Sequence, residues 1–356
     1  MLLTIYDLKL KGVIINMNCG TNKTILIDAH FDLLLDLVIQ RSKGRTQVIE
    51  QDYLDDFKKG GFSIIVLAVF IENMYLPEMA LKKALEQISA LYAEIEESSG
   101  EIMLCKSNSD VINAIENEKL GVILSLEGVE PIFNDLNLLR VFYQLGVRGL
   151  GITWSRRNFA ADGCNFSSIP GPQKGGLTDF GYELVTEAEK LGMFIDVTHL
   201  NDEGFEDVIK CSKKPIIASH SNCRTLTNMQ RNLTDEQIKA IANNGGMICV
   251  NACNIIVADD DENSNVEYLG NHIDHIVNLV GIDYVGFGFD FCDRFMKYNA
   301  IDDLKVLPRT PFDVIKGHGN VGELLDLLCN RGYSSDDLEK IGYKNYLRML
   351  KNTLRG

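Results

Sequence analysis

The sequence predicts a single (β/α)₈ barrel, and three observations support this fold class. Short apolar segments typical of strands buried on both faces alternate with helical patterns, and eight of them begin near residues 24, 63, 121, 147, 193, 215, 246 and 284. A chain of 356 residues fits such a barrel as one domain. Polar residues follow the strand segments, where the active sites of these barrels lie. The alternative, a doubly wound open sheet, lacks a glycine-rich phosphate turn after the first strand.

One domain is expected over residues 24–356, preceded by a short preamble over residues 1–23. Within the preamble, Leu2–Ile5 and Gly12–Ile15 are expected as two strands around a turn. The remaining chain has no linker, low-complexity segment or internal repeat that would divide it.

The first two barrel units are predicted from residues 24–95. The first strand begins at Thr24 and gives way to a helical pattern over residues 31–39, and a second helix over 53–59 precedes the next strand. Residues 61–70 form a continuous apolar run, as required of a strand that is covered on both faces. Over residues 81–95, Leu, Ile and Tyr recur every three or four positions, which is typical of an amphipathic helix.

The same alternation predicts the other six units. A loop rich in Gly, Ser and Pro is expected over residues 162–176. Thr234 is the expected N-cap of the helix predicted over residues 234–242. The predicted strand and helix pairs are 121–126 and 136–145, 147–152 and 180–190, 193–197 and 203–209, 215–218 and 234–242, 246–250 and 271–280, followed by the strand 284–289 and the C-terminal helices 321–328 and 335–349.

Composition excludes several classes of protein. The chain has 35 Lys+Arg against 50 Asp+Glu, a net charge of −15, which opposes binding to nucleic acid. Nine cysteines without paired spacing indicate reduced thiols. The N-terminus has no signal-peptide pattern, and no run approaches the ~18 apolar residues of a membrane-spanning helix. A cytoplasmic protein is expected.

Candidate site residues collect at the ends of the predicted strands. In an extended segment, residues two apart point to the same side, so His30 and Asp32 face the same space. Each candidate alone could be a helix cap or a core histidine, but their common location favours a pair of metal ions with open coordination positions. The strand ends carry His30, Asp32, Glu127, Thr153, Trp154, His199, His220, Asn251 and Asp290.

Other histidines are expected to be structural. His272 and His275 lie three apart on a predicted helix, but this helix precedes the last strand and lies away from the active face. His318 lies between two glycines in a late loop without a recognisable partner. The sequence contains neither a Gly-x-Ser-x-Gly elbow nor a Walker loop.

The motifs around these residues resemble the membrane dipeptidase (renal dipeptidase) family of zinc peptidases, in a microbial form. The likeness covers nearly the whole chain from Leu26 and agrees in order and spacing. The segments that carry it are Asp28–Asp32, Ser125–Gly128, Asp196–His199, Ala218–Ser221, Gln230–Leu233, His272–His275, Val285–Phe291, Arg331–Ser334 and Asn345–Arg348.

The resemblance implies a dinuclear zinc dipeptidase with a defined set of site residues. His30 and Asp32 would bind one zinc, His199 and His220 the other, and Glu127 would bridge them. Arg231 would hold the terminal carboxylate of the substrate, and Asp290 would act as general base and acid. Trp154 and Asn251 would contact the substrate. The family cleaves dipeptides and tolerates a D-residue at the C-terminal position.

Three positions depart from the family pattern. Trp154 stands where mammalian members carry a histidine thought to contact the oxyanion, and an indole cannot become cationic. Either Arg156 or Arg157 would make the oxyanion contact in place of this histidine, or both lie exposed at the surface. Ala252-Cys253 replaces residues that are often aromatic, and Asp290-Phe-Cys-Asp293 replaces Asp-Phe-Asp-Gly. Neither a signal sequence nor a lipid anchor of the mammalian kind is expected, which would agree with a microbial cytosolic form.

Two alternatives stay open beside the metallo-dipeptidase. One is another amidohydrolase acting on a cyclic amide or an amino-acid derivative, which a lysine at the end of the fourth strand would favour. The other is a metal- or peptide-binding barrel that has lost turnover, suggested by Trp154. The expected partner is a small dipeptide, with no nucleic acid and no membrane, and a homodimer is a possible assembly.

Overall fold

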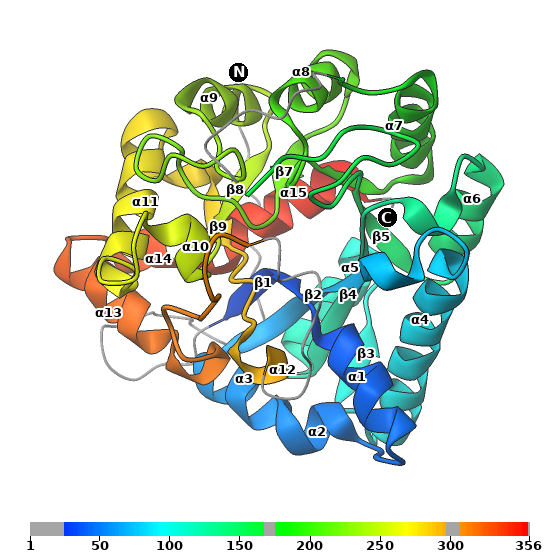
Figure 1. Ribbon diagram of the computed structural model, residues 1–356. Helices are drawn as coiled ribbons and strands as arrows, with labels where there is room; N and C mark the ends of the chain where they lie inside the picture. Colours follow the sequence, from blue (N-terminus) through cyan, green and yellow to red (C-terminus); the bar gives the residue numbers. More distant parts are fainter. Residues whose placement is uncertain (1–24, 167–174, 297–306, 355–356) are drawn as a thin grey trace, which may run out of the picture.

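Eight parallel strands close into a barrel in the computed structural model, which describes residues 25–166, 175–296 and 307–354. The ring closes because β9 pairs with both β8 and β1, and β2 pairs with both β1 and β4 (Figure 1). In order around the barrel the strands are β1 (Leu26–Phe31), β2 (Phe62–Phe70), β4 (Leu120–Glu127), β5 (Val147–Gly151), β6 (Phe194–Asp196), β7 (Ile216–Ala218), β8 (Met247–Val250) and β9 (Val285–Phe287).

The eight predicted strands are confirmed, and one further strand was not predicted. β3 (Ile102–Leu104) pairs with the first residues of β4, whereas β5 pairs with β4 only from Leu124 onward. β3 therefore occupies the edge of β4 that β5 leaves open. Three residues are too few to show a period in the sequence. The predicted strands of the preamble lie outside the described residues.

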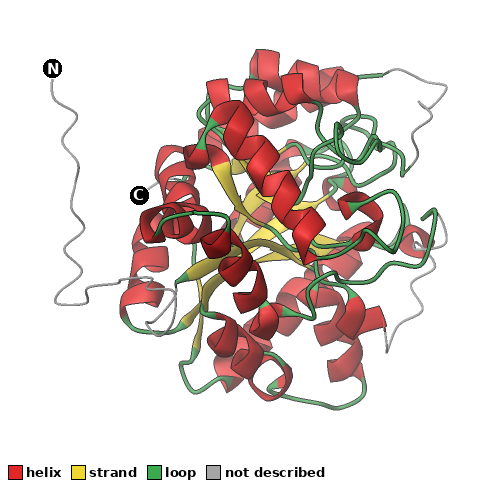
Figure 2. Ribbon diagram, turned by 90° about the vertical axis from the view of Figure 1, so that its left-hand side faces the viewer, coloured by secondary structure: helices red, strands yellow, loops and turns green. Residues whose placement is uncertain are grey.

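Helices surround the strands on the outside of the barrel (Figure 2). Their bounds are α1 (Leu33–Ser42), α2 (Val48–Asp52), α3 (Leu54–Gly60), α4 (Ala80–Glu97), α5 (Asn108–Glu116), α6 (Leu136–Gln144), α7 (Asp179–Leu191), α8 (Asp202–Cys211), α9 (Asp235–Asn243), α10 (Asn254–Val257), α11 (Val266–Val280), α12 (Asp293–Met296), α13 (Gly322–Asn330), α14 (Ser335–Glu339) and α15 (Asn345–Thr353). No helix in these described ranges combines the length and the apolar character needed to cross a lipid bilayer.

Two helix predictions need correction, and one cap is confirmed. α11 begins five residues earlier than predicted because the side chain of Asn265 accepts a hydrogen bond from the Tyr268 backbone N–H and caps the helix there. The helix predicted over residues 335–349 is divided by a π-helical turn, Lys340–Lys344. Thr234 is the N-cap of α9, as predicted, and completes a capping box with Gln237.

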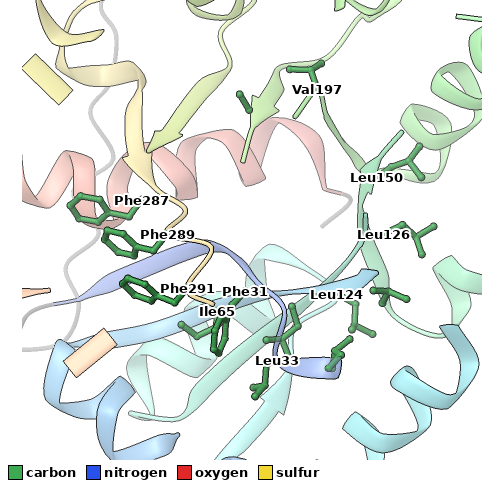
Figure 3. Packing of buried hydrophobic residues seen from close by; sticks show 14 of the residues in the cluster. Phe31, Leu33, Ile65, Leu124, Leu126, Leu150, Val197, Phe287, Phe289 and Phe291 are labelled. Atoms are coloured by element: carbon green, nitrogen blue, oxygen red, sulfur yellow. The ribbon is translucent and has the colours of Figure 1, made fainter. Parts of the chain in front are cut away.

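Phenylalanines at the end of β9 and directly after it pack between the barrel and its helices. Phe287, Phe289 and Phe291 alternate along the chain and therefore share one face, where successive ring centroids lie 5.0 Å apart (Figure 3). All three are buried. Burying each such side chain contributes roughly 1.5–3 kcal/mol, so this stack holds β9 in place at the edge of the site.

The C-terminal helix closes the end of the barrel where the strands begin. Met349 and Leu350 of α15 pack into a cluster with residues that point into the barrel, such as Ile64 and Ile123. The Asn345 side chain donates hydrogen bonds to the Ile282 and Val285 carbonyls at 2.8 and 2.9 Å, at the start of β9. The candidate site lies at the opposite end of the barrel, where the strands finish.

Candidate metal centre

The C-terminal ends of five strands bring the predicted ionisable residues into one space. His30 lies within β1 and Asp32 directly follows it, and Glu127 is the last residue of β4. His199, His220 and Asp290 follow β6, β7 and β9. Because the strands are parallel, their ends meet at the same rim of the barrel, as the sequence predicted.

Glu127 lies between two sets of ligand-type atoms. Its Oε2 is 3.7 Å from His30 Nε2, which in turn is 3.8 Å from Asp32 Oδ1. Its Oε1 is 3.0 Å from His199 Nε2 and 3.7 Å from His220 Nε2. Each oxygen of this carboxylate thus faces a different pair of residues, which is the geometry of a carboxylate able to bridge two metal ions.

Two buried atoms of the site have no hydrogen-bond partner in the described structure. They are His30 Nε2 and Asp32 Oδ1. Leaving such an atom unsatisfied costs about 1–3 kcal/mol, so a ligand is expected to satisfy them. His199 Nε2 and His220 Nε2 also approach to 3.0 Å, and both face this space. Imidazole nitrogens and carboxylate oxygens are common zinc ligands, so these residues fit that metal.

Hydrogen bonds behind the histidines fix which ring nitrogen faces the site. His220 Nδ1 donates to Ser219 Oγ at 2.7 Å, and this hydroxyl donates to Asp196 Oδ2 at 2.5 Å. Asp196 also accepts the Thr198 and Ser219 backbone N–H groups, both at 3.0 Å. The chain from Asp196 leaves the His220 Nε2 lone pair directed at the centre, as a metal-ligating histidine requires.

Burial keeps the three imidazoles neutral. It lowers the pKa of His30 to about 3, with a smaller contribution from the positive charge of Arg231. Burial likewise lowers the pKa values of His199 and His220 well below the ordinary value. A neutral imidazole is the form that coordinates a metal ion, so no proton has to be displaced near neutral pH.

The acidic residues of the site repel one another. Burial, followed by the charge of Asp290, raises the pKa of Asp32 well above its usual range. The pKa of Glu127 is raised by burial and by the charges of Asp32 and Asp290. Buried carboxylates that resist ionisation need a nearby cation to become charged, so the electrostatics of the site favour cation binding.

Two of these residues have a strained backbone. His199 and Asp290 have φ angles of 70° and 56°, in the left-handed region that non-glycine residues rarely occupy. The Asp290 N–H donates to the His30 carbonyl at 3.3 Å, and Asn251 Nδ2 donates to Asp290 Oδ2 at 2.8 Å. Surrounding contacts therefore hold Asp290 in an unusual conformation, a feature found at functional sites.

Asp290 lies beside the ligand-type residues with a pKa near neutrality. Its Oδ1 is 3.9 Å from His30 Nε2. Burial raises its pKa to about 6, although Arg231 and the hydrogen bond from Asn251 act in the opposite direction. A carboxyl group with this pKa can both accept and donate a proton near neutral pH.

Arg231 is a buried cation without a carboxylate within ion-pair distance among the described residues. Its side chain is 3% exposed. Nη1 donates to Ser221 Oγ at 2.8 Å, and Nη2 donates to the His220 carbonyl at 2.7 Å. Burying a charge without a counter-ion is costly, so this guanidinium suits an anionic group brought by a ligand.

A pocket opens over these groups, and much of its wall is apolar. Trp154 forms part of this wall. Its ring centroid lies 5.3 Å from the ring centroid of Phe70 and 5.9 Å from that of His199. The residues that line the pocket are Asp32, Leu35, Phe70, Glu127, Trp154, Phe166, His199, Arg231, Asn251, Cys253, Ile255, Ile256, Asp290, Cys292, Leu307 and Pro311.

Neither arginine after Trp154 lines this pocket, which answers the question left open by the sequence. Arg156 donates to Glu130 Oε1 at 2.6 Å and to the Ile71 carbonyl at 2.7 Å, and it stacks against the Trp154 ring. Arg157 pairs with Asp162 and is largely exposed. Of the two alternatives for these arginines, contact with the oxyanion in place of the missing histidine has no support in the structure, because both side chains are engaged elsewhere.

The remaining histidines have structural partners. His272 Nε2 donates to the Val257 carbonyl at 2.7 Å, and His275 pairs with Asp235 at 2.8 Å, so both are outside the site, as predicted. His318, for which the sequence suggested no partner, donates from Nε2 to Asp28 Oδ2 at 2.7 Å. The only signal for this pair was a carboxylate inside an apolar strand.

The comparisons with known proteins agree on one family. A family model for membrane dipeptidases (peptidase family M19) matches residues 20–355. An uncharacterized protein of Klebsiella pneumoniae is 33% identical over 271 residues, which are 75% of this chain and 94% of that protein. Dipeptidase verJ of Clonostachys rogersoniana is 29% identical over 271 residues, which are 76% of this chain and 65% of that protein.

A solved structure of a metallo peptidase is also similar to this chain. The metallo peptidase from Rhodobacter sphaeroides, liganded with a phosphinate mimic of the dipeptide L-Ala-D-Ala, has a TM-score of 0.81 and 26% sequence identity. The match covers 93% of this chain and 100% of that chain. The chain therefore belongs to the membrane dipeptidase family, peptidase family M19, and is a metallo-dipeptidase on a TIM barrel.

Proposed function

We propose that this protein hydrolyses dipeptides with two zinc ions, one bound by His30 and Asp32, the other by His199 and His220, and both by Glu127. The observation that carries this proposal is the position of Glu127, whose two oxygens face the two pairs of residues. The unsatisfied atoms of His30 and Asp32 support it further. Zinc in such a site supplies a water with a pKa of roughly 7 and polarises a carbonyl group.

Asp290 is proposed as the general base and acid. It takes a proton from the attacking water and returns it to the departing amine, two transfers that suit a carboxyl group with a pKa of about 6. Asn251 holds Asp290 for this task through its 2.8 Å hydrogen bond. Since Asn251 also lines the pocket, the predicted contact with substrate stays part of the proposal.

Arg231 is proposed to bind the terminal carboxylate of the substrate. The guanidinium is buried and lines the pocket, and no carboxylate among the described residues neutralises it. A bidentate pair with the substrate would place the peptide bond at a fixed distance from the metal-ligand residues. The mimic bound to the Rhodobacter sphaeroides relative supports a dipeptide, including one with a D-residue at its C-terminal position.

Trp154 is proposed to contact the substrate as an apolar wall. Its ring lies against Phe70 and near His199, on the pocket surface. An indole N–H can donate one hydrogen bond but carries no charge, so Trp154 cannot supply positive charge at the carbonyl oxygen, and metal ions held by the residues named above would supply it. Apolar side chains in the substrate should therefore be accepted well at this wall.

One experiment tests the function directly. Bound metal is measured in the purified protein, followed by hydrolysis of L,L- and L,D-dipeptides and of a cyclic-amide panel. Two zinc ions per chain with dipeptide turnover is the expected result. Turnover of cyclic amides alone would indicate another amidohydrolase, and zinc without any turnover would indicate a binding protein. Full activity in metal-free protein would refute the mechanism.

A further inference from the structure

Arg156 contacts two aromatic side chains of the pocket wall. Its guanidinium carbon lies over both rings, 5.2 Å from the ring centroid of Trp154 and 5.3 Å from that of Phe70. The centroids of these two rings are themselves 5.3 Å apart. Both rings line the pocket, whereas Arg156 does not. One cation therefore contacts both rings from outside the pocket, at distances where a guanidinium and an aromatic ring attract each other.

Three hydrogen bonds fix the position of this guanidinium. Nε donates to Glu130 Oε1 at 2.6 Å, Nη2 to the Ile71 carbonyl at 2.7 Å, and Nη1 to Asn73 Oδ1 at 3.1 Å. Arg156 lies after β5, Glu130 after β4 and Ile71 after β2, so one side chain joins the ends of three neighbouring strands. Only the planar fork of an arginine can donate in these three directions and stack at the same time.

The ion pair between Arg156 and Glu130 is largely buried. Their side chains are 13% and 9% exposed. The Glu130 carboxylate lies against Gly128, where a Cβ atom would overlap Oε2, so the glycine after Glu127 makes room for this pair. Removing one partner of a buried pair leaves the other charge uncompensated, which is costly. The pair therefore holds Arg156 against the two rings more firmly than a surface contact would.

Phe70 also borders a second cavity, of about 120 Å³, that has no part in the proposed hydrolysis. The second cavity shares Leu35 and Phe70 with the substrate pocket, so these two side chains separate the two spaces. Its other walls come from α1, the chain after β2, and α4. Open space on both sides leaves room for the Phe70 ring to turn, so a contact from a third direction is needed to fix it. Arg156 provides this contact.

We propose that Arg156 is a positioning residue that holds Trp154 and Phe70 in place and thereby limits the size of the substrate side chain that the pocket accepts. With the wall fixed, a pocket of about 100 Å³ favours a small side chain such as that of alanine over that of phenylalanine. Without the guanidinium, Phe70 turns toward the second cavity and the pocket admits larger side chains. This effect on substrates rests on the proposed function, whereas the fixed position of the rings does not.

Fluorescence tests the position of the rings without any substrate. Trp154 is the only tryptophan of the chain, so the tryptophan emission reports on this wall alone. In the unaltered protein, time-resolved anisotropy should show an indole that moves only with the whole molecule. Arg156→Lys keeps a positive charge opposite Glu130 but loses the planar fork, so its emission should shift to longer wavelength, with fast local motion of the indole and stronger quenching by acrylamide. Arg157→Lys is the matched control, because this exposed arginine pairs with Asp162 instead, and it should change none of these signals.

Kinetics test the effect on substrate choice with the full-length, zinc-loaded proteins. The substrates are L-Ala-D-Ala, L-Phe-D-Ala and L-Ala-D-Phe. Arg156→Lys should raise kcat/KM for a phenylalanine-containing dipeptide relative to L-Ala-D-Ala by on the order of tenfold, the discrimination that a small change in an apolar pocket produces. The double variant Glu130→Gln, Arg156→Met removes both charges, so it leaves no buried charge without a partner, and it should shift the ratio in the same direction. Arg157→Lys should leave the ratio unchanged.

The outcomes separate this proposal from the function itself. A freely moving indole in the unaltered protein would overturn the positioning role without any variant, and so would an indole that stays fixed in both altered proteins. An equal loss of kcat/KM for all three dipeptides would overturn the role of Arg156 in substrate choice. If no dipeptide is hydrolysed although the indole is fixed and Arg156→Lys releases it, the positioning role stands and the proposed function fails.

Discussion

His318 and Asp28 lie 290 residues apart in the sequence and meet directly beneath the candidate metal centre, with Nε2 2.7 Å from Oδ2. The other oxygen of Asp28 accepts the Phe289 and His30 backbone N–H groups at 2.9 and 3.3 Å. One carboxylate thus ties the end of β1, which carries His30, to the chain after β9, which carries Asp290. The His318 ring is fixed among four phenylalanines, with centroids 4.7–4.8 Å away.

Replacement of His318 should therefore affect stability and metal binding together. In His318→Leu, Asp28 Oδ2 loses its only donor among the described residues, and a buried unsatisfied acceptor costs about 1–3 kcal/mol. Urea denaturation should show this loss, and a zinc titration should show weaker binding because His30 is less well held. His275→Leu is the control. It breaks a similar pair with Asp235 that is partly exposed, so it should cost about 1 kcal/mol or less and leave zinc binding unchanged.

Substitution of Glu127 should have opposite effects on the metal-free and the zinc-loaded protein. Burial and the neighbouring carboxylates raise the pKa of Glu127, so its ionised form destabilises the metal-free fold at neutral pH. Glu127→Gln removes this charge and should raise the free energy of unfolding without metal by about 1 kcal/mol or more. Zinc should then add much less stability than in the unaltered protein. Equal stabilisation by zinc in both proteins would contradict a bridging role.

Removal of the Asp290 carboxylate should separate proton transfer from metal binding. Asp290→Asn is a suitable change because Asn tolerates the left-handed backbone at φ 56°. If Asp290 transfers the proton, kcat should fall on the order of 10²–10⁴-fold while zinc content is unchanged. Metal analysis beside steady-state kinetics checks both statements, and loss of zinc in this variant would assign Asp290 to metal binding instead.

The role of Arg231 can be measured with substrates that lack the terminal charge. Hydrogen bonds to a charged group contribute about 1.5–3 kcal/mol, so Arg231→Gln should raise KM for a dipeptide on the order of tenfold to a hundredfold. The corresponding dipeptide amide should bind the unaltered protein weakly and lose little more in the variant. Similar losses for both substrates would show that Arg231 supports the structure around His220 rather than the substrate.

His272 should make stability depend on pH. Burial removes the ring from water and lowers its pKa from 6.5 to about 4, although the hydrogen bond to the Val257 carbonyl acts in the opposite direction. The unfolded chain binds a proton on this ring below about pH 6.5 but the folded chain only below about pH 4. The free energy of unfolding should therefore fall as pH drops through this window, by up to about 3 kcal/mol. Denaturation curves at pH 7 and pH 5 should show a smaller difference for His272→Gln.

The barrel could be read from the sequence because its strands are covered on both faces. A strand such as Phe62–Phe70 is apolar throughout, and the predicted strand starts agree with the structure to within about two residues for this reason. The candidate ligands followed from the same pattern, since parallel strands deliver their ends to one rim. β3 was missed because it pairs with only three residues of β4.

Contacts between distant segments could not be predicted from the sequence. The partner of His318 depends on how the loop before α13 folds under β1, and no local period records this. The same holds for Arg156, whose partner Glu130 begins the short 3₁₀ helix after β4. The cytoplasmic location and the homodimer stay predictions.

The position of α15 has a consequence for the order in which the protein matures. This last helix fills the lower end of the barrel, where Met349 and Leu350 pack against inward-facing residues of the strands. During synthesis all eight strands leave the ribosome before α15 does, and an uncovered apolar interior is prone to aggregation. The barrel interior thus stays uncovered at this end until α15 has been made, and the strands without α15 should be more prone to aggregation than the chain that includes it.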